Sequence, residues 1–193
     1  GQLSGGKNYL FHGYWQNKTY VESLQQTLNE KLKFNIEPDT EEKKIMELME
    51  QSVSVSLHIR RGDYLSPENK TKFSGICTDD YYSRAIKYFT QKYPHVLFFV
   101  FSDDEVYVKK NYNGMTNFYI MKKHEKDYHD MFLMSKCRHN IIANSSFSWW
   151  AAWLNKNPQK EIICPSEWFN IEDISQKILQ DKWIKISRNG EIK

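Results

Sequence analysis

Residues 53–59, Val53-Ser54-Val55-Ser56-Leu57-His58-Ile59, alternate between large apolar side chains and polar ones. Strict alternation over seven residues predicts a β-strand. Val55, Leu57 and Ile59 share one face of this strand on a period of two, while Ser56, His58 and Arg60 share the other. His58 and Arg60 therefore point the same way at the end of the strand, where Arg61 begins a turn that Gly62 permits.

Strand and helix patterns alternate along the rest of the chain. We expect helices at 78–92, after 102–104, at 126–136 and at 147–155, and further strands at 96–101, 117–120, 140–143 and 162–164. The Asn-Gly pairs, 113–114 and 189–190, lie at a helix end and near the C-terminus, so no hairpin signal joins two apolar runs. Five strands separated by four helices predict right-handed βαβ units. The fold class is therefore α/β, a Rossmann-like parallel sheet with flanking helices.

The N-terminal quarter of the chain reads differently. Residues 14–33 look helical, and Asp39 offers an N-cap for a second helix that carries Ile45, Leu48 and Met49 on one face. Residues 1–50 are interpreted as a helical segment and linker, and residues 51–193 as the domain that contains the sheet. The glycine-rich start, 1–6, reads as a tag residue or linker.

Composition excludes several classes of protein. Hydrophobic residues make up 40% of the 193 residues and charged residues 26%, which is typical of a folded globular protein. The net charge of +3 does not indicate a nucleic-acid partner. Three distant cysteines without CxxC spacing favour a reducing cytosol, and the longest apolar run, about seven residues, is too short to span a bilayer.

In a parallel sheet, ligands bind beyond the carboxyl ends of the strands. The first strand ends in Arg60 and Arg61, whose planar guanidinium groups suit a diphosphate. The alternative is an ordinary surface ion pair between one of these arginines and Asp63.

The second strand ends in Ser102-Asp103-Asp104. Ser102 or Asp103 would cap the following helix, leaving a carboxylate free to bind a guanine edge or a ribose hydroxyl. Two adjacent aspartates also resemble a metal site. Metal-binding nucleotide-sugar enzymes usually carry Asp-x-Asp, however, and this triplet does not occur, so we expect no metal and no cofactor.

The third strand end is the start of a helix rich in serine. Its first residues are Asn144, Ser145, Ser146, Phe147 and Ser148. Free N–H groups and the helix dipole at such a terminus bind phosphate. A serine-capped helix packed through its tryptophans is the alternative, but it does not explain the excess of serines. A fourth group, Lys122-Lys123-His124 with Asp127, His129 and Asp130, is interpreted as a solvated surface.

Taken in order, these strand ends resemble glycosyltransferase family 11, the α-1,2-fucosyltransferases. The stretches that carry the resemblance are GYWQ (13–16), HIRRGDY (58–64), CTDDYYSRAI (77–86), FSDD (101–104), HNIIANSSFSWWAAWLN (139–155) and ICPSEWF (164–169). They cover nearly the whole chain.

The resemblance implies that the chain is mainly the C-terminal, GDP-fucose-binding domain of a GT-B enzyme. It also implies inverting, metal-independent transfer of L-fucose from GDP-β-L-fucose to the 2-hydroxyl of a galactose-containing acceptor. Arg60 would hold the β-phosphate, and His58 with Asp103 or Asp104 would lie near the nucleoside. The diphosphate pocket would include Ser145, Ser146, Phe147 and Ser148, with Arg61 and Asn144 as further substrate-binding candidates.

One departure from the family concerns the N-terminal domain, whose glycine-rich GGLGNQMFQ-like stretch is missing. The acceptor site would lie in that domain. Asp63 is the in-chain candidate for the general base, although orienting Arg60 or Arg61 is the role we favour. We expect a cytoplasmic protein with a peripheral association at the inner membrane face through a lipid-linked acceptor. The competing interpretations are a non-catalytic guanine-nucleotide or glycan-binding module and a phosphate-binding hydrolase.

Overall fold

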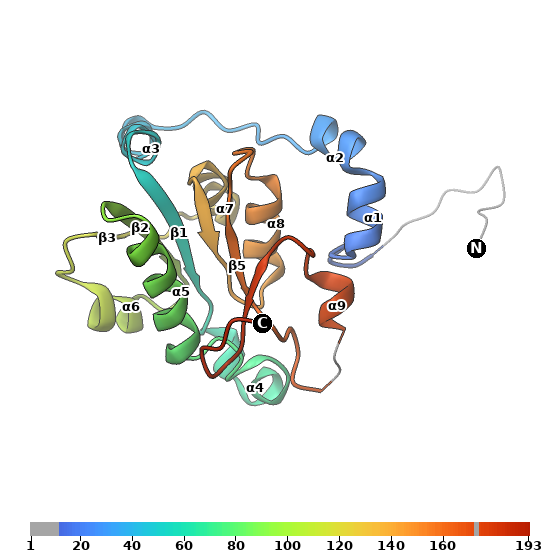
Figure 1. Cartoon of the computed structure of the whole chain (residues 1–193). Coiled ribbons are helices and arrows are strands. Elements are labelled where there is room, and N and C mark those ends of the chain that lie inside the picture. The colour runs from blue at the N-terminus through green and yellow to red at the C-terminus, as the bar shows by residue number, and fades with distance from the viewer. Residues whose placement is uncertain (1–11, 172–173) are drawn as a thin grey trace.

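The computed structural model describes residues 12–171 and 174–193, so the glycine-rich start at 1–6 lies outside the described residues. Its described strands form one six-stranded sheet in the order β3-β2-β1-β4-β5-β6, and every neighbouring pair is parallel (Figure 1). The strands are β1 (Val53–Ile59), β2 (Val96–Ser102), β3 (Phe118–Ile120), β4 (His139–Ile141), β5 (Ile162–Pro165) and β6 (Ile184–Ile186). The predicted Rossmann-like α/β fold is confirmed.

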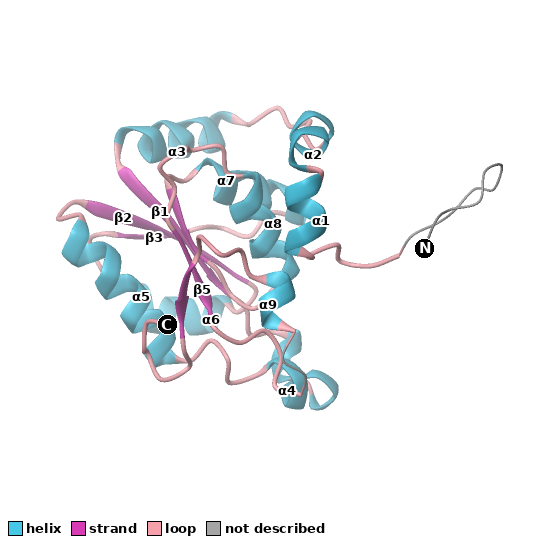
Figure 2. Cartoon of the chain, turned by 45° about the vertical axis from the view of Figure 1, so that its right-hand side comes forward, coloured by secondary structure: helices cyan, strands magenta, loops and turns pink. Residues whose placement is uncertain are grey.

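Helices cover both faces of the sheet (Figure 2). On one face lie α5 (Asp79–Lys92) and α6 (Glu105–Tyr112). The other face is covered by α3 (Thr40–Gln51), α7 (Asp127–Lys136) and α8 (Ser146–Leu154), with α1 (Lys18–Ser23) and α9 (Ser175–Ile178) packed beyond α8. The remaining helices are α2 (Gln25–Lys31), α4 (Pro67–Phe73) and a 3-10 turn, η1 (Asp63–Leu65).

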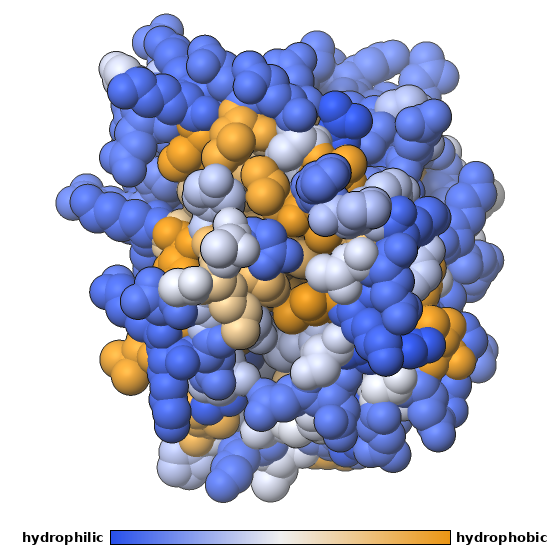
Figure 3. Space-filling view, turned by 60° about the vertical axis from the view of Figure 1, so that its left-hand side comes forward, coloured by the Kyte–Doolittle hydropathy of each residue, from blue (hydrophilic) through white to orange (hydrophobic). Residues whose placement is uncertain are grey.

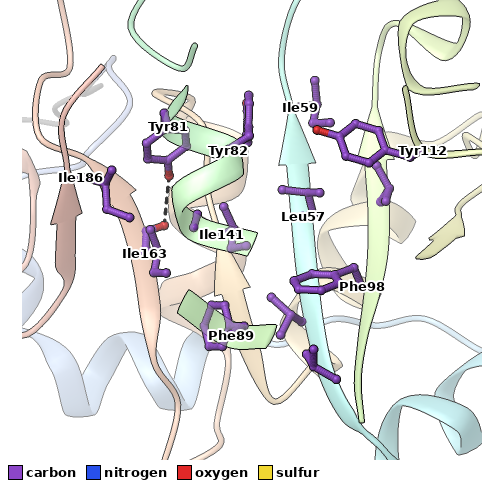
Figure 4. Close-up of a cluster of buried hydrophobic side chains, with 14 of the residues drawn as sticks. Leu57, Ile59, Tyr81, Tyr82, Phe89, Phe98, Tyr112, Ile141, Ile163 and Ile186 are labelled. Atoms are coloured by element: carbon purple, nitrogen blue, oxygen red, sulfur yellow. Dashed lines mark hydrogen bonds between the residues drawn. The ribbon is translucent and has the colours of Figure 1, made fainter. Parts of the chain in front are cut away.

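The alternation in β1 separates an apolar core from a polar network. Leu57 and Ile59 are fully buried on the face covered by α5, in the same apolar cluster as Tyr81, Tyr82 and Phe89 (Figure 4). The hydroxyl of Tyr81 donates to the carbonyl oxygen of Ile142 at 2.6 Å, so even this core ring has its polar atom satisfied. The neighbouring strand β2, which is covered on both faces, is by contrast a continuous apolar run, as is typical of a buried parallel strand.

The opposite face of β1 is held by the side chain of Asn140. Its Nδ2 donates to Ser56 Oγ at 2.7 Å and to the carbonyl oxygen of Met134 at 2.9 Å, and its Oδ1 accepts from Asn155 Nδ2 at 2.8 Å. One fully buried amide thus ties β1 and β4 to α7 and to the end of α8. Of the serines in this strand, Ser56 belongs to the network, whereas Ser54 Oγ donates to the carbonyl oxygen of Met49 and accepts from Arg138 N.

Local capping explains the elements that the sequence predicted best. Asp39 accepts from Glu42 N while the Glu42 side chain accepts from Asp39 N, which is a complete capping box for α3. Thr78 caps α5 in the same manner, through Tyr81 N. Both helices begin where the sequence predicted.

The ends of the chain differ from the prediction. The single helix expected at 14–33 is two short helices separated at Leu24, and the predicted set of five strands lacked β6. Asn189-Gly190 does form a reverse turn, in which Gly190 has a φ of +77° and donates to the carbonyl oxygen of Ser187. An antiparallel bridge between Ile186 and Ile192 follows from this turn, so the hairpin signal set aside in the sequence was real.

The described surface is mostly polar. In the view of Figure 3 hydrophilic residues cover most of the face, and hydrophobic residues gather near its middle. Among the described helices, none has the length and apolar composition that would let it cross a membrane.

Replacing Asn140 by alanine is expected to lower the free energy of unfolding by about 3 kcal/mol, because it leaves buried partners on three elements unsatisfied. Urea denaturation followed by circular dichroism measures this loss. The control is Asn111→Ala, whose side chain bonds only to the exposed carbonyl of Tyr107 and which we expect to change stability by less than about 0.5 kcal/mol. Equal losses in the two variants would contradict the assigned role of Asn140.

Candidate functional site

A cleft of about 380 Å³ opens beyond the carboxyl ends of β1, β2 and β4. Parallel pairing brings these ends to one edge of the sheet, as expected. The predicted site residues that line the cleft are His58, Arg60, Asp63, Asp103, Asn144, Ser145, Ser146 and Phe147. Arg61, Asp104 and Ser148 are not among its lining residues.

Arg60 lies between two carboxylates. Its Nη2 is 2.9 Å from Asp63 Oδ1, and its Nη1 is 3.1 Å from Asp103 Oδ2. The carboxylates differ in exposure, since the side chain of Asp63 is 50% exposed and that of Asp103 only 15%. The ion pair with Asp63, weighed in the sequence as the ordinary alternative, is thus present, but it lies within the cleft.

Asp103 is fixed by a second bond, because its Oδ1 accepts from Arg61 N at 2.9 Å. Gly62 makes this arrangement sterically possible. A methyl group on Gly62 would lie 2.7 Å from Asp103 Oδ2 and 3.1 Å from its Cγ, closer than such atoms can approach. With a φ of −33°, Gly62 is needed for close approach and not for a left-handed backbone.

Arg61 and Asp104 form a separate pair outside the cleft. Arg61 Nε is 3.1 Å from Asp104 Oδ2, and its guanidinium carbon lies 4.0 Å from the ring centroid of Tyr107. Asp104 caps α6 by accepting from Tyr107 N at 2.9 Å. The prediction that Ser102 or Asp103 caps this helix was therefore wrong, and Asp103 is the carboxylate that faces the cleft.

His58 lines the cleft with an unsatisfied ring nitrogen. The residue is 4% exposed, and its Nδ1 has no hydrogen-bond partner. Burial, and secondarily the charge of Arg60, lower the pKa of His58 to about 4, with Asp103 acting in the opposite direction. His58 is therefore a neutral imidazole at pH 7, and its ring packs 5.7 Å from that of Phe147.

The start of α8 forms the opposite wall. Ser145 is its N-cap residue but makes no side-chain capping bond, so no side chain caps the first N–H groups of the helix. Ser148 lies behind the wall, fully buried, with its Oγ 3.4 Å from the carbonyl oxygens of Ala143 and Ser145. Asn144 Nδ2 donates to the carbonyl oxygens of Phe73 and Trp168, both at 3.2 Å, and so joins the end of α4 to the loop after β5.

Sequence reasoning missed several lining residues. Three rings, from η1, from the end of α4 and from the loop after β5, line one side, with Tyr64 stacked 4.9 Å from Phe73 and Phe73 5.4 Å from Phe169. Gln16 and Tyr14 also line the cleft. The GYWQ stretch was visible in the sequence, but no local pattern indicated which of its side chains would turn inward.

The predicted solvated surface at 122–130 was wrong in part. His124 Nδ1 lies 2.6 Å from Asp130 Oδ1, and His129 Nδ1 lies 2.7 Å from Oε1 of Glu42, which is buried. Burial raises the pKa of Asp130, and its bond to His124 opposes this shift. No group of three or more His, Cys, Asp or Glu residues in the described part of the chain is arranged to hold a metal ion.

Comparison with known proteins finds relatives that are named as glycosyltransferases. The family described as Glycosyl transferase family 11 matches residues 2–187. The O-antigen biosynthesis glycosyltransferase WbnK of Escherichia coli is 37% identical over 193 residues, covering 96% of this chain and 63% of the relative. An alpha-1,2-colitosyltransferase of Escherichia coli is 35% identical over 194 residues, covering 97% of this chain and 65% of the relative.

A more distant relative is the galactoside 2-alpha-L-fucosyltransferase SEC1 of Bos taurus, 26% identical over 145 residues, with coverage of 72% of this chain and 39% of the relative. The chain spans 63% and 65% of the lengths of the two Escherichia coli relatives.

Replacing Gly62 by alanine is expected to cost about 1–2 kcal/mol of unfolding free energy, because Asp103 is pinned by two bonds and cannot turn away cheaply. In an Asp103→Ala background the same substitution should cost less than about 0.5 kcal/mol, since the clash is gone. Denaturant unfolding of the four proteins in this cycle measures both values. Gly13→Ala is the control, because an added methyl group there meets nothing within 4 Å. Additive losses in the cycle would contradict the contact.

The lowered pKa of His58 predicts how stability depends on pH. Because the unfolded chain binds a proton near the ordinary pKa of 6.5 and the folded chain only near 4, the stability present above pH 6.5 is lost as pH falls from 6.5 to 4. This loss approaches about 1.4 kcal/mol per pH unit. His58→Asn, which cannot titrate, should remove that part of the slope in urea denaturation series, whereas His95→Asn at an exposed position should keep it. An unchanged slope in His58→Asn would contradict the assignment.

Proposed function

The chain belongs to glycosyl transferase family 11, and we propose that it is the donor-binding part of an enzyme that transfers L-fucose from GDP-β-L-fucose to the 2-hydroxyl of a galactose-containing acceptor. The reaction is proposed to be inverting and independent of metal. The observation that carries the proposal is the cleft at the carboxyl edge of the sheet. There the Arg60 guanidinium, the uncapped start of α8 and the unsatisfied, buried His58 Nδ1 line one cavity.

The proposed diphosphate site combines Arg60 with the start of α8. A guanidinium presents paired N–H donors that match phosphate oxygens, and a helix N-terminus adds backbone N–H groups and a partial positive charge. As the bond to the sugar breaks, negative charge grows on the leaving diphosphate. Fixed donors aimed at that charge stabilise the transition state without help from a cation.

A diphosphate must compete with the carboxylates that already bind Arg60. Asp63 is the weaker competitor, because it is half exposed and the structure gives it no other ion pair, whereas Asp103 is mostly buried and also accepts from Arg61 N. We assign Asp63 to orienting Arg60 in the ligand-free protein. Its displacement by the donor would free a carboxylate in the cleft, and Asp63 is therefore the in-chain candidate for the general base.

The nucleoside would contact groups that carry no net charge at pH 7 or that accept N–H bonds. His58 Nδ1 needs a partner, and the Asp103 carboxylate lies at the same edge of the sheet. The stacked rings of Tyr64 and Phe73, with the ring of Phe169 tilted against Phe73, offer an apolar surface for a base or a sugar face.

A second candidate function is transfer of a colitosyl residue, favoured by the 35% identity to an alpha-1,2-colitosyltransferase. The relative named as an O-antigen biosynthesis glycosyltransferase favours a cell-surface polysaccharide as the acceptor in either case. An acceptor of that kind carried on a lipid would bring the protein to the inner face of the membrane. A non-catalytic module that binds guanine nucleotides would bind the same donor without transferring its sugar.

Arg60→Lys is expected to lower the affinity for GDP and GDP-fucose about thirtyfold, because lysine keeps the charge but lacks the paired donors. In the full-length enzyme the corresponding loss in transition-state stabilisation is about 2–4 kcal/mol. Calorimetric titration of the native chain and the variant with GDP, GDP-fucose and UDP measures the effect. The native chain should prefer the guanine nucleotides.

The control is Arg138→Lys, since Arg138 donates to the exposed carbonyl of Glu50 and does not line the cleft. Binding of UDP as tight as that of GDP would contradict the proposed donor. Native-like GDP affinity in Arg60→Lys would contradict the assigned phosphate site. The two candidate functions are distinguished by whether the full-length enzyme transfers fucose or colitose to a β-galactoside.

A further inference from the structure

The side chain of Gln16 is the feature of the cleft that the proposed function leaves unused. It is 8% exposed, lines the same cavity as His58 and Arg60, and its Nε2 has no hydrogen-bond partner. Four buried side-chain polar atoms lack a partner in the described part of the chain, and two of them, Gln16 Nε2 and His58 Nδ1, line this one cavity. A buried polar group left without a hydrogen-bond partner is destabilising, so such a pair at one place indicates a ligand that satisfies it.

The segment that carries Gln16 has a strained backbone, and it exposes its aromatic side chains while it buries its polar one. Tyr14 is 77% exposed and Trp15 is half exposed, while the polar Gln16 between them and α1 is buried. Trp15 has a φ of +56°, the one positive φ among the described residues other than glycine. This left-handed conformation is unfavourable for a residue other than glycine, and backbone strain of this kind is concentrated at functional sites.

Gln16 is also held in place from both sides. Before it, Trp150 Nε1 donates to the carbonyl oxygen of Tyr14 at 3.0 Å, which fastens the segment to α8 (Figure 2). After it, Asn17 caps α1 by accepting from Tyr20 N, and Val21 anchors that helix in the core. The backbone on both sides of Gln16 is fixed in this way, so binding of a ligand by its side chain does not have to order the segment that carries it.

The chemistry of the Gln16 amide indicates which part of the ligand it contacts. The guanidinium of Arg60 and the start of α8 already serve the diphosphate, which leaves the amide of Gln16 for an uncharged part of the ligand. The amide suits an uncharged oxygen, a hydroxyl or a carbonyl. We propose that Gln16 Nε2 donates a hydrogen bond to a hydroxyl or carbonyl oxygen of the bound nucleotide sugar, so that the GYWQ segment forms a specificity-determining wall of the donor site. This inference rests on the proposed function.

The test is calorimetric binding of GDP and of GDP-fucose to the chain and to Gln16→Leu, with Gln16→Glu as a second, isosteric variant that lacks the donor. We expect Gln16→Leu to bind GDP-fucose about tenfold more weakly. Its ligand-free melting temperature should be unchanged or higher, because an unsatisfied polar group has been removed. Gln25→Leu, at an exposed position on α2, is the matched control and should bind as the native chain does.

The two ligands locate the contact. A loss confined to GDP-fucose places the accepting oxygen on the transferred sugar, and an equal loss for GDP places it on the nucleoside; both results support the proposal. Affinities within twofold of native for both Gln16 variants would overturn it, as would a lower melting temperature of ligand-free Gln16→Leu, which would make the amide a structural group. A native chain that binds neither nucleotide would overturn the proposed function and this inference together.

Discussion

Burial of β1 on both faces and along both edges is the constraint on which the rest of the structure depends. The strand pairs with β2 over its whole length and with β4 over three residues, so its backbone is satisfied within the sheet. Its apolar face packs on α5, and its serine face meets the Asn140 network beneath α7 and α8. A strand fixed in this way ends at a defined point, and because all its neighbours are parallel, their ends meet there too. The position of Arg60 follows from this pairing rather than from any local feature of its own loop.

The cleft and the core differ in whether their buried polar atoms have hydrogen-bond partners. In the core the hydroxyl of Tyr81 and the amide of Asn140 have partners, as buried polar groups in folded proteins generally do. At the cleft, His58 Nδ1 and Gln16 Nε2 do not. Of the four buried side-chain polar atoms without a partner in the described residues, two therefore lie in this one cavity. Stability is reduced there by about 1–3 kcal/mol for each group, and a ligand that pairs with both regains it as binding free energy.

The sequence predicted those parts of the fold that short-range rules decide. The alternation of β1, the capping box at Asp39 and the cap at Thr78 involve residues within four positions of one another, and they gave correct boundaries. Topology then brought His58, Arg60, Asp103 and the α8 serines together. What the sequence could not decide were choices between neighbours of the same type. Asp103 and Asp104 are equivalent in the sequence, and the choice between them depends on the turn at Gly62, where the absence of a side chain lets Asp103 approach. Gln16 and β6 depend on packing against residues more than 20 positions away.

The ion pairs of Arg60 bear on which anions the proposed donor site can bind. The cleft contains the carboxylates of Asp63, Asp103, Asp127 and Asp130 beside the cations Arg60 and Lys123, so it is not a simple basic patch that attracts any anion. A ligand phosphate has to replace a carboxylate that already neutralises the guanidinium, and a singly charged anion gains little from that exchange. A diphosphate carries more charge and reaches both Arg60 and the N–H groups of α8, so it gains two sets of contacts while displacing one half-exposed carboxylate. Under the proposed function, selectivity for a nucleoside diphosphate sugar over smaller anions thus follows from the competition with Asp63 as much as from the attraction of Arg60.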